Sequence, residues 1–193
     1  MDGADDVDRV KKKMVFVTVG TTCFDSLVRA VDTEEVRLEL SSRGYTDLLI
    51  QMGRGSYVPS KVVGQVDPLS SAALQFSGED GSVSVDYFTF SSSIADYLKS
   101  ASLVISHAGS GSIFETLRLG KPLIVVVNED LMDNHQCELA DELAERRHLF
   151  CCRPRTLRQT LQSMDLESLL PYPPGDAMPV ARLINRFLGF PVD

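Results

Sequence analysis

The stretch ASLVISHAGSGSIFETLRLG, residues 101–120, decides the fold of this chain. Its first residues are apolar and suit a buried strand, its centre holds Gly109 and Gly111, and the residues from Ile113 onward have helical spacing. A strand that turns through glycines into a helix aims unpaired backbone N–H groups and the positive end of the helix dipole at one spot. The stretch therefore predicts an anion site at the end of a strand.

Gly109, Gly111 and Glu115 indicate which anion binds. A glycine has no Cβ, so the backbone at these positions can approach a diphosphate closely. The Glu115 carboxylate lies one turn into the helix, where it can accept hydrogen bonds from a ribose diol beside that diphosphate. These residues favour a nucleotide. A capping box stays open as the alternative, because Ser112 and Glu115 also have the spacing with which a serine and a glutamate cap a helix.

The stretch lacks three common motifs of nucleotide and hydrolase sites. It has neither the G-x-G-x-x-G spacing of dinucleotide folds nor the terminal Gly-Lys-Ser/Thr of a P-loop. Ala108 stands where a nucleophile elbow at Ser110 would need glycine. The function therefore has to be argued from the rest of the chain as well.

Composition restricts the class of protein. The chain has 193 residues, of which 44% are hydrophobic and 24% charged, and this is enough for one sizeable α/β core. The net charge of −8 argues against nucleic acid as a partner and against electrostatic adhesion to an anionic membrane. The basic run at residues 11–13 follows acidic residues in an N-terminal tail, and we interpret it as solvated.

The apolar runs and the cysteines indicate where the chain resides. No apolar stretch reaches the ~20 residues that a membrane span needs, and the acidic start does not resemble a signal peptide. We therefore expect a soluble, cytoplasmic chain. The four cysteines show no C-x-x-C pairing, which favours reduced structural thiols over a zinc site; they are Cys23, Cys137, Cys151 and Cys152.

Strand and helix patterns alternate along the chain. Apolar or β-branched runs predict strands at residues 14–19, 47–51, 83–88, 103–106, 122–127 and 149–152. Helical spacing predicts helices at residues 24–31, 34–43, 92–100, 113–119, 134–146 and 154–164, with Gly120 as the C-cap of the fourth. Nearly continuous apolar strands that alternate with helices predict an α/β fold, a single Rossmann-like domain with a parallel sheet covered on both faces.

The ends of the chain differ from its centre. We expect an N-terminal tail at residues 1–13, the Rossmann-like domain at 14–170, and a third segment at 171–193. In that third segment a Pro-rich break precedes an amphipathic helix at residues 177–188. The apolar stripe of this helix either packs onto the parent domain or forms part of an interface with a partner.

Three loops with unusual chemistry follow carboxyl ends of predicted strands, after Val19, Ile105 and Val127. Ligands of parallel sheets bind at these ends. We therefore expect the loops to converge on one crevice. Simpler roles stay open for two groups of residues: residues 134–136 could merely begin a helix, and His107 could be a hydrogen-bonded histidine at a strand end.

Five motifs, in the same order, resemble those of a known family. They are VFVTVGTT from Val15, QMGRG from Gln51, SLVISHAGSGSIFE from Ser102, GKPLIVVVN from Gly120 and LMDNHQ from Leu131. On these residues the chain resembles the soluble catalytic subunits of eukaryotic UDP-N-acetylglucosamine (UDP-GlcNAc) transferases, which add the second sugar to the dolichol-linked oligosaccharide. More distantly it is similar to the nucleotide-sugar half of GT-B glycosyltransferases, including the bacterial peptidoglycan N-acetylglucosamine transferases of glycosyltransferase family 28.

The resemblance implies a UDP-GlcNAc site. The 109–112 turn would hold the diphosphate, Glu115 the ribose hydroxyls, and the 20–22 turn the phosphate side of the cleft. His135 and Gln136 fall where the distant relatives contact sugar hydroxyls. The residues expected at the site are Gly20, Thr21, Thr22, His107, Gly109, Ser110, Gly111, Ser112, Glu115, Asn134, His135 and Gln136.

The resemblance also implies a reaction and a partner. The reaction is an inverting transfer of N-acetylglucosamine from UDP-GlcNAc to dolichyl-diphosphate-GlcNAc, without a cofactor or a metal ion. This chain would be the C-terminal half of a GT-B enzyme, so a membrane-anchored subunit would bind the acceptor. The heterodimer would lie on the cytosolic face of the endoplasmic reticulum. No residue of this chain is assigned as the catalytic base.

Two other functions are weighed against this one. Binding motifs survive the loss of turnover, so a non-catalytic nucleotide-sugar-binding or regulatory subunit stays open. A nicotinamide oxidoreductase is disfavoured, because residues 19–22 do not form the dinucleotide fingerprint.

Overall fold

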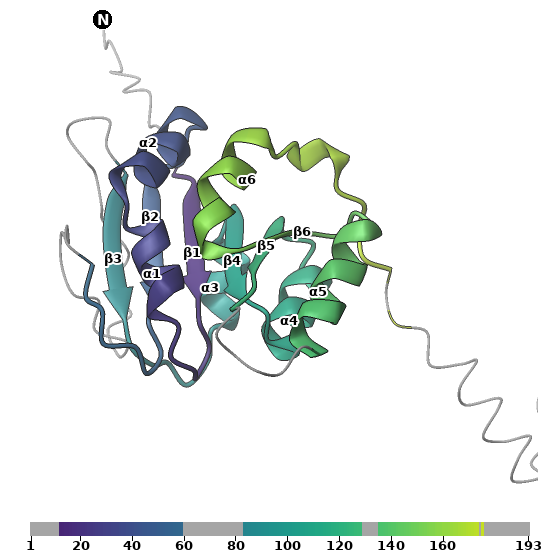
Figure 1. The fold of residues 1–193 in the computed structure, drawn as a ribbon, viewed down its shortest axis with the longest axis horizontal. Helices are drawn as coiled ribbons and strands as arrows, with labels where there is room; N and C mark the ends of the chain where they lie inside the picture. Colours follow the sequence, from purple (N-terminus) through teal and green to yellow (C-terminus); the bar gives the residue numbers. More distant parts are fainter. Residues whose placement is uncertain (1–11, 60–82, 129–134, 174, 176–193) are drawn as a thin grey trace, which may run out of the picture.

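The fold is one parallel sheet covered by helices, drawn in Figure 1. The computed structural model describes residues 12–59, 83–128, 135–173 and Gly175. Its six strands lie in the order β3-β2-β1-β4-β5-β6, and every neighbouring pair is parallel. The strands are β1 (Met14–Thr18), β2 (Asp47–Gln51), β3 (Ser84–Phe88), β4 (Leu103–His107), β5 (Leu123–Val126) and β6 (Phe150–Cys152). We call the edge at which these strands end the carboxyl edge.

Helices cover both faces of the sheet (Figure 1). One face carries α1 (Asp25–Val31), α2 (Glu34–Ser42) and α6 (Leu157–Ser163). The other carries α3 (Ala95–Ser100), α4 (Ser110–Arg118) and α5 (His135–Glu145). The short 3-10 helices η1 (Pro154–Thr156) and η2 (Leu166–Ser168) flank α6. The predicted α/β domain with a doubly covered parallel sheet is confirmed.

Strand β1 explains why the strands are apolar without interruption. Val15 and Val17 belong to the core beneath α1, α2 and α6, whereas Met14 and Phe16 belong to the core beneath α3, α4 and α5. Successive side chains of a strand point to opposite faces, so a strand buried on both sides needs apolar residues at every position. Its central place lets β1 pair with both β2 and β4.

Two predicted helices begin elsewhere in the structure. Helix α4 starts at Ser110 rather than at Ile113, and this shift determines how the glycines are used. Helix α3 starts at Ala95 rather than at Ser92, because the side chains of Ser91 and Ser93 form local turn bonds that compete with helical ones. The predicted helix at 154–164 is the 3-10 helix η1 followed by α6.

Gly120 ends α4 as predicted. Its φ is +63°, a left-handed conformation that suits glycine, and its N–H donates to the Leu117 carbonyl at 3.0 Å. The N–H of Lys121 donates to the Thr116 carbonyl at 3.3 Å. This pair of bonds is the Schellman motif, which satisfies carbonyls at the end of a helix.

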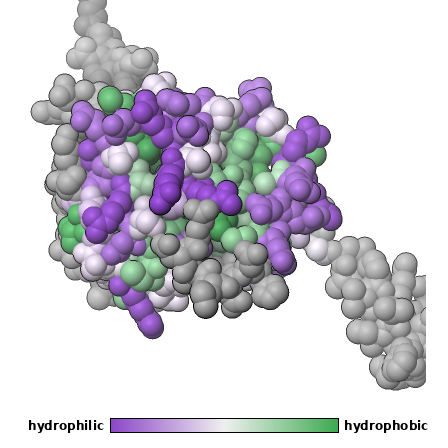
Figure 2. Space-filling model, in the orientation of Figure 1, coloured by the Kyte–Doolittle hydropathy of each residue, from purple (hydrophilic) through white to green (hydrophobic). Residues whose placement is uncertain are grey.

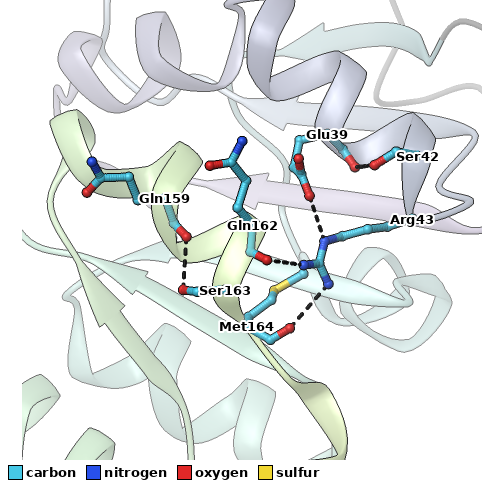
Figure 3. Close-up of polar contacts among 7 residues, drawn as sticks. All are labelled: Glu39, Ser42, Arg43, Gln159, Gln162, Ser163 and Met164. Carbon is cyan, nitrogen blue, oxygen red and sulfur yellow. Dashed lines mark hydrogen bonds and ion pairs between the residues drawn. The ribbon is translucent and has the colours of Figure 1, made fainter.

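Arg43 joins the first half of the chain to the last (Figure 3). Its guanidinium donates to the carbonyls of Gln162 at 2.8 Å and Met164 at 3.2 Å, and it pairs with Glu39 at 3.0 Å. These bonds fasten α2 to the end of α6 across the same face of the sheet. In Figure 2 that face is hydrophilic over α1 and α2 and apolar around β6, where Phe150 is only half-buried.

Several predictions fall outside the described residues. They are residues 1–11 of the predicted tail at 1–13, Asn134 at the predicted start of a helix, and the helix at 177–188. Within the described ranges, no helix has the length and apolarity needed to cross a membrane.

Candidate functional site

Loops from the carboxyl ends of β1, β2 and β4 touch one another. The Arg54 N–H, on the loop after β2, donates to the Thr22 carbonyl on the turn after β1 at 2.9 Å. The turn after β1 also contacts the end of β4, because Gly20 packs against the ring of His107. The predicted convergence of the first two glycine turns at the carboxyl edge is thus seen in the structure.

His107 occupies the space between two glycines. A Cβ built on Gly20 would lie 2.7 Å from the imidazole, and a Cβ built on Gly109 would lie 2.3 Å from its Nε2. Both distances are too short for real side chains, so the ring fits only because both residues are glycine. Gly20 is needed for a second reason, since its φ is +62°. His107 therefore sets the spacing between the turn after β1 and the start of α4.

Burial controls the charge of His107. It lowers the pKa of the imidazole, an effect that the main chain of Thr18 partly opposes. The buried Nδ1 has no hydrogen-bond partner among the described residues. A pKa below the ordinary value of imidazole favours the neutral ring at pH 7, and the simpler interpretation of a hydrogen-bonded histidine at a strand end stays open beside the functional one.

The start of α4 is open to a ligand. Gly109 is the N-cap residue and provides no side-chain cap, and the first helical bond joins the Ile113 N–H to the Gly109 carbonyl at 3.1 Å. The N–H groups of residues 110–112 precede that bond and have no partner within the helix. A Cβ added to Gly111 would meet nothing within 4 Å. The described part of the protein thus does not require glycine at that position.

The capping-box alternative for Ser112 and Glu115 is wrong. A capping box would place Ser112 outside the helix as the N-cap. Ser112 instead lies inside α4, where its carbonyl accepts from the Thr116 hydroxyl at 2.7 Å. The half-buried Glu115 side chain forms no hydrogen bond or ion pair with any described residue. Its carboxylate is available to a ligand.

The turn after β1 is built by its threonines. The buried Thr18 hydroxyl donates to the Gln51 side chain and accepts from the Gly20 N–H at 3.1 Å. Both Thr21 and Thr22 are exposed, but Thr22 donates its hydroxyl to the Val19 carbonyl at 2.8 Å, whereas the Thr21 hydroxyl has no partner among the described residues. Thr22 therefore shapes the turn, and Thr21 presents its hydroxyl to solvent.

Sequence reasoning did not include the loop after β2 among the site residues, although its QMGRG motif was a signal. Gly53 has a φ of +58°, and its Cβ would lie 2.4 Å from the Thr22 carbonyl oxygen. The Asp25 carboxylate accepts from the Ser56 N–H at 3.0 Å and from its hydroxyl at 2.9 Å. Burial alone would raise the pKa of Asp25, but the hydrogen bonds from Ser56 and from the Tyr57 backbone, together with the charge of Arg29, lower it. The loop is fixed against β1 and α1.

The third predicted loop is only partly described. His135 and Gln136 begin α5, but their side chains and all of Asn134 lie outside the described part of the structure. Within that part, no group of three or more His, Cys, Asp or Glu residues could hold a metal ion. Burial also raises the pKa of Cys151 to about 12 and of Cys152 to about 11, so these thiols are poor nucleophiles and poor metal ligands.

Far from these loops, a cavity of about 140 Å³ opens where β1, β2 and β3 begin. The Asp86 carboxylate lines it, is only 4% exposed, and has no hydrogen-bond partner among the described residues. Burial and the nearby Asp47 raise the pKa of Asp86 to about 6. This cavity lies at the amino edge and is separate from the candidate site.

Comparison with known proteins gives a family match and close relatives. Residues 14–187 match the glycosyltransferase family 28 C-terminal domain. The chain is 42% identical over 156 residues to the UDP-N-acetylglucosamine transferase subunit ALG13 of Homo sapiens, covering 81% of this chain and 12% of the human protein. It is 36% identical over 182 residues to the Saccharomyces cerevisiae subunit of that name, covering 85% of this chain and 90% of the yeast protein. The chain thus spans about an eighth of the human relative's length and most of the yeast relative's.

Solved structures agree with the fold. An NMR solution structure of ALG13 matches with a TM-score of 0.62 and 30% identity, covering 90% of this chain and 96% of that one. The crystal structure of Acinetobacter baumannii MurG matches with a TM-score of 0.53 and 16% identity, covering 82% of this chain and 43% of MurG. At that identity MurG supports the fold alone, and it does so with less than half of its own length.

Proposed function

The chain belongs to the glycosyltransferase family 28 C-terminal domain family, and from that membership we propose that it binds UDP-GlcNAc as one subunit of an N-acetylglucosaminyltransferase. The observation that carries the proposal is the uncapped start of α4, with free space at Gly111 and an unpartnered Glu115 one turn further on. A helix start of this kind suits a diphosphate, and a free carboxylate beside it suits a ribose diol.

In the proposed complex each group has a defined task. The N–H groups of residues 110–112 and the dipole of α4 hold the diphosphate, while Glu115 accepts from the ribose hydroxyls. The 20–22 turn lines the phosphate side, and residues 134–136 reach the sugar. His107, being neutral, can donate one hydrogen bond to a phosphate oxygen without adding charge.

The proposed reaction is an inverting transfer. The acceptor hydroxyl of dolichyl-diphosphate-GlcNAc attacks the anomeric carbon, the bond from that carbon to the UDP oxygen breaks, and a base takes the hydroxyl proton. UDP leaves with added negative charge on its diphosphate. The start of α4 stabilises that charge as it develops, which is how this subunit contributes to catalysis. The base belongs to the partner or to the junction between the two chains.

A partner is part of the proposal. The human and yeast relatives are named as subunits, and MurG is more than twice as long as the part that matches this chain. We propose a heterodimer with a membrane-anchored subunit that binds the lipid-linked acceptor at the cytosolic face of the endoplasmic reticulum. The segment at 171–193 is proposed to contribute to that interface.

A thermal-shift experiment tests the nucleotide site. UDP-GlcNAc and UDP should raise the unfolding temperature of the full chain, because a ligand at 100 times its Kd adds about 2.7 kcal/mol of stability to the folded state. NAD should leave the unfolding temperature unchanged. Stabilisation by NAD and not by UDP would make the site a dinucleotide site.

A transfer assay then tests catalysis. The chain is used to capture its partner from a membrane extract, and the complex is supplied with UDP-GlcNAc and a lipid-diphosphate GlcNAc acceptor. We expect transfer of one further GlcNAc. A complex that binds UDP yet transfers nothing would mean that the chain is a non-catalytic nucleotide-sugar-binding subunit.

A further inference from the structure

The QMGRG motif after β2 has no task in the site proposed above. Its Arg54 is exposed, and its guanidinium forms no hydrogen bond or ion pair with any described residue. An arginine without a partner that is held in a fixed place is a candidate for binding a ligand.

The backbone of Arg54 is held on several sides. Its own N–H donates to the Thr22 carbonyl, and the N–H of Gly53 donates to the Thr89 carbonyl at 3.1 Å. Two residues further on, Ser56 is bound by Asp25. The loop therefore cannot swing away from the carboxyl edge, although the long side chain of Arg54 is free to turn.

Strand order places Arg54 near the start of α4. Neighbouring strands lie about 4.8 Å apart, so the end of β2 is two such steps from the end of β4. The hydrogen bond to Thr22 holds the backbone of Arg54 against the turn after β1, so Arg54 lies closer to the end of β4 than the end of β2 does. The same turn packs through Gly20 on His107. The backbone of Arg54 thus lies against the turn that contacts His107, and the long arginine side chain can extend from there toward the start of α4.

Charge adds a second argument. Loops join the ends of β1, β2, β3 and β4 to the next helix or to the end of the described range. Among the described residues of these loops, Arg54 is the only arginine or lysine. Burial lowers the pKa of His107, which favours its neutral form. The chain as a whole carries a net charge of −8. A diphosphate at this edge needs a cation to offset its charge, and arginine offers phosphate oxygens two parallel hydrogen bonds.

We infer that Arg54 binds the diphosphate of the nucleotide sugar. The diphosphate would then lie between the start of α4 on one side and the Arg54 guanidinium on the other. This inference rests on the proposed function, because it assigns a new residue to the same site. It makes the QMGRG loop a diphosphate clamp: Gly53 and Gly55 allow the loop to lie close to β1 and Asp25, and Arg54 supplies the charge.

Arg54→Ala is a clean test, because the loop is fastened through main-chain atoms that alanine keeps. UDP and UMP binding to the full chain is measured by titration calorimetry for the wild type, Arg54→Ala and Arg54→Lys. Arg118→Ala is the matched control, since Arg118 is also exposed but lies at the far end of α4. We expect Arg54→Ala to bind UDP at least tenfold more weakly, to lose more affinity for UDP than for UMP, and to be less sensitive to salt. Arg54→Lys should fall in between, and Arg118→Ala should match the wild type.

Each other result overturns the inference in a recognisable way. Wild-type UDP affinity in Arg54→Ala, or an equal loss for UDP and UMP, means that Arg54 does not bind the diphosphate, while the nucleotide site itself stands. Failure of the wild type to bind UDP removes the site and the clamp together. Thermal unfolding of each variant without ligand shows whether a loss of affinity comes from a loss of fold.

Discussion

Gly109 and Gly111 are two residues apart and do different work. At Gly109 the protein itself excludes a side chain, because the His107 ring occupies the space that a Cβ would take. At Gly111 no described residue stands in the way, which leaves the space beside it open to a ligand. Sequence reasoning treated the two positions alike, since neither the ring nor the empty space leaves a trace in the pattern of residues.

The two glycines should therefore respond differently to alanine. Gly109→Ala should destabilise the fold, because Cβ would lie 2.3 Å from Nε2 of His107. Gly111→Ala should leave the fold intact or stabilise it by about 0.5–1 kcal/mol, since alanine favours a helix, and it should weaken UDP binding at least tenfold. Thermal unfolding and UDP titration of both variants measure these effects. Gly111→Ala with unaltered UDP affinity would show that the free space does not receive the diphosphate.

Glu115 offers a second test at the scale of one residue. Its carboxylate has no described partner, so Glu115→Ala should hardly change the free energy of unfolding. It should weaken UDP binding by about 1.5–3 kcal/mol, the value of a hydrogen bond to a charged group. Glu145→Ala is the control, because Glu145 is an exposed helical glutamate far from the start of α4. If the two variants bind UDP equally well, Glu115 does not contact the ribose.

The meeting of the turn after β1 with the start of α4 could be predicted, because both follow strands that the apolar runs mark clearly. Gly20, His107 and Gly109 were expected together and are found in contact. Arg54 was not assigned a role, because its position depends on main-chain bonds to Thr22 and on the order of the strands, and neither is encoded locally.

At the scale of elements, the strands were predicted well and the helix starts less well. The central strands β1, β4 and β5 are short, mostly apolar runs whose burial on both faces leaves little freedom of assignment. The start of α4 was placed late because Ser110, Gly111 and Ser112 have low helix propensity, and packing of Ile113 and Leu117 on the sheet overrides it. The serines before α3 had the opposite effect, since their turn bonds delay the helix.

Edge strand β3 carries a buried aspartate, Asp86, whose surroundings destabilise its ionised form. The Asp86 carboxylate is buried beside a cavity and near Asp47, and this raises its pKa to about 6 from an ordinary 3.8. Between these values the folded protein holds a proton that the unfolded chain has released. Stability should therefore fall as the pH rises from about 4 to about 6 and stay at the lower level above that.

Asp86→Asn removes that charge. At pH 7.5 we expect the variant to be more stable than the wild type by about 1–3 kcal/mol, and its stability should change less between pH 4 and 6. Denaturant unfolding at several pH values measures both effects. Asp96→Asn, at an exposed position on α3, should leave the pH profile unaltered. A destabilised Asp86→Asn at pH 7.5 would show that the carboxylate has a partner in the folded protein.

At the scale of the whole molecule, the site offers a helix dipole, backbone N–H groups and one arginine to a diphosphate. Within the described ranges it offers no group of carboxylates to a divalent ion. We therefore expect GlcNAc transfer by the assembled complex to continue in EDTA at more than half of its rate without chelator. Loss of transfer in EDTA that manganese or magnesium restores would contradict this prediction.

The bonds of Arg43 to Gln162 and Met164 have a consequence for the order in which the chain becomes a stable domain. They join residues 119 and 121 positions apart, so they cannot form until nearly all of the domain has been synthesised. Contacts of such large sequence separation form slowly and late in folding. A nascent chain that ends before α6 leaves the Arg43 guanidinium without these acceptors and leaves α2 without α6 beside it. Until α6 has been made, the apolar core residues that α2 and α6 cover together stay incompletely buried, so a nascent chain of that length should aggregate more readily than the completed domain.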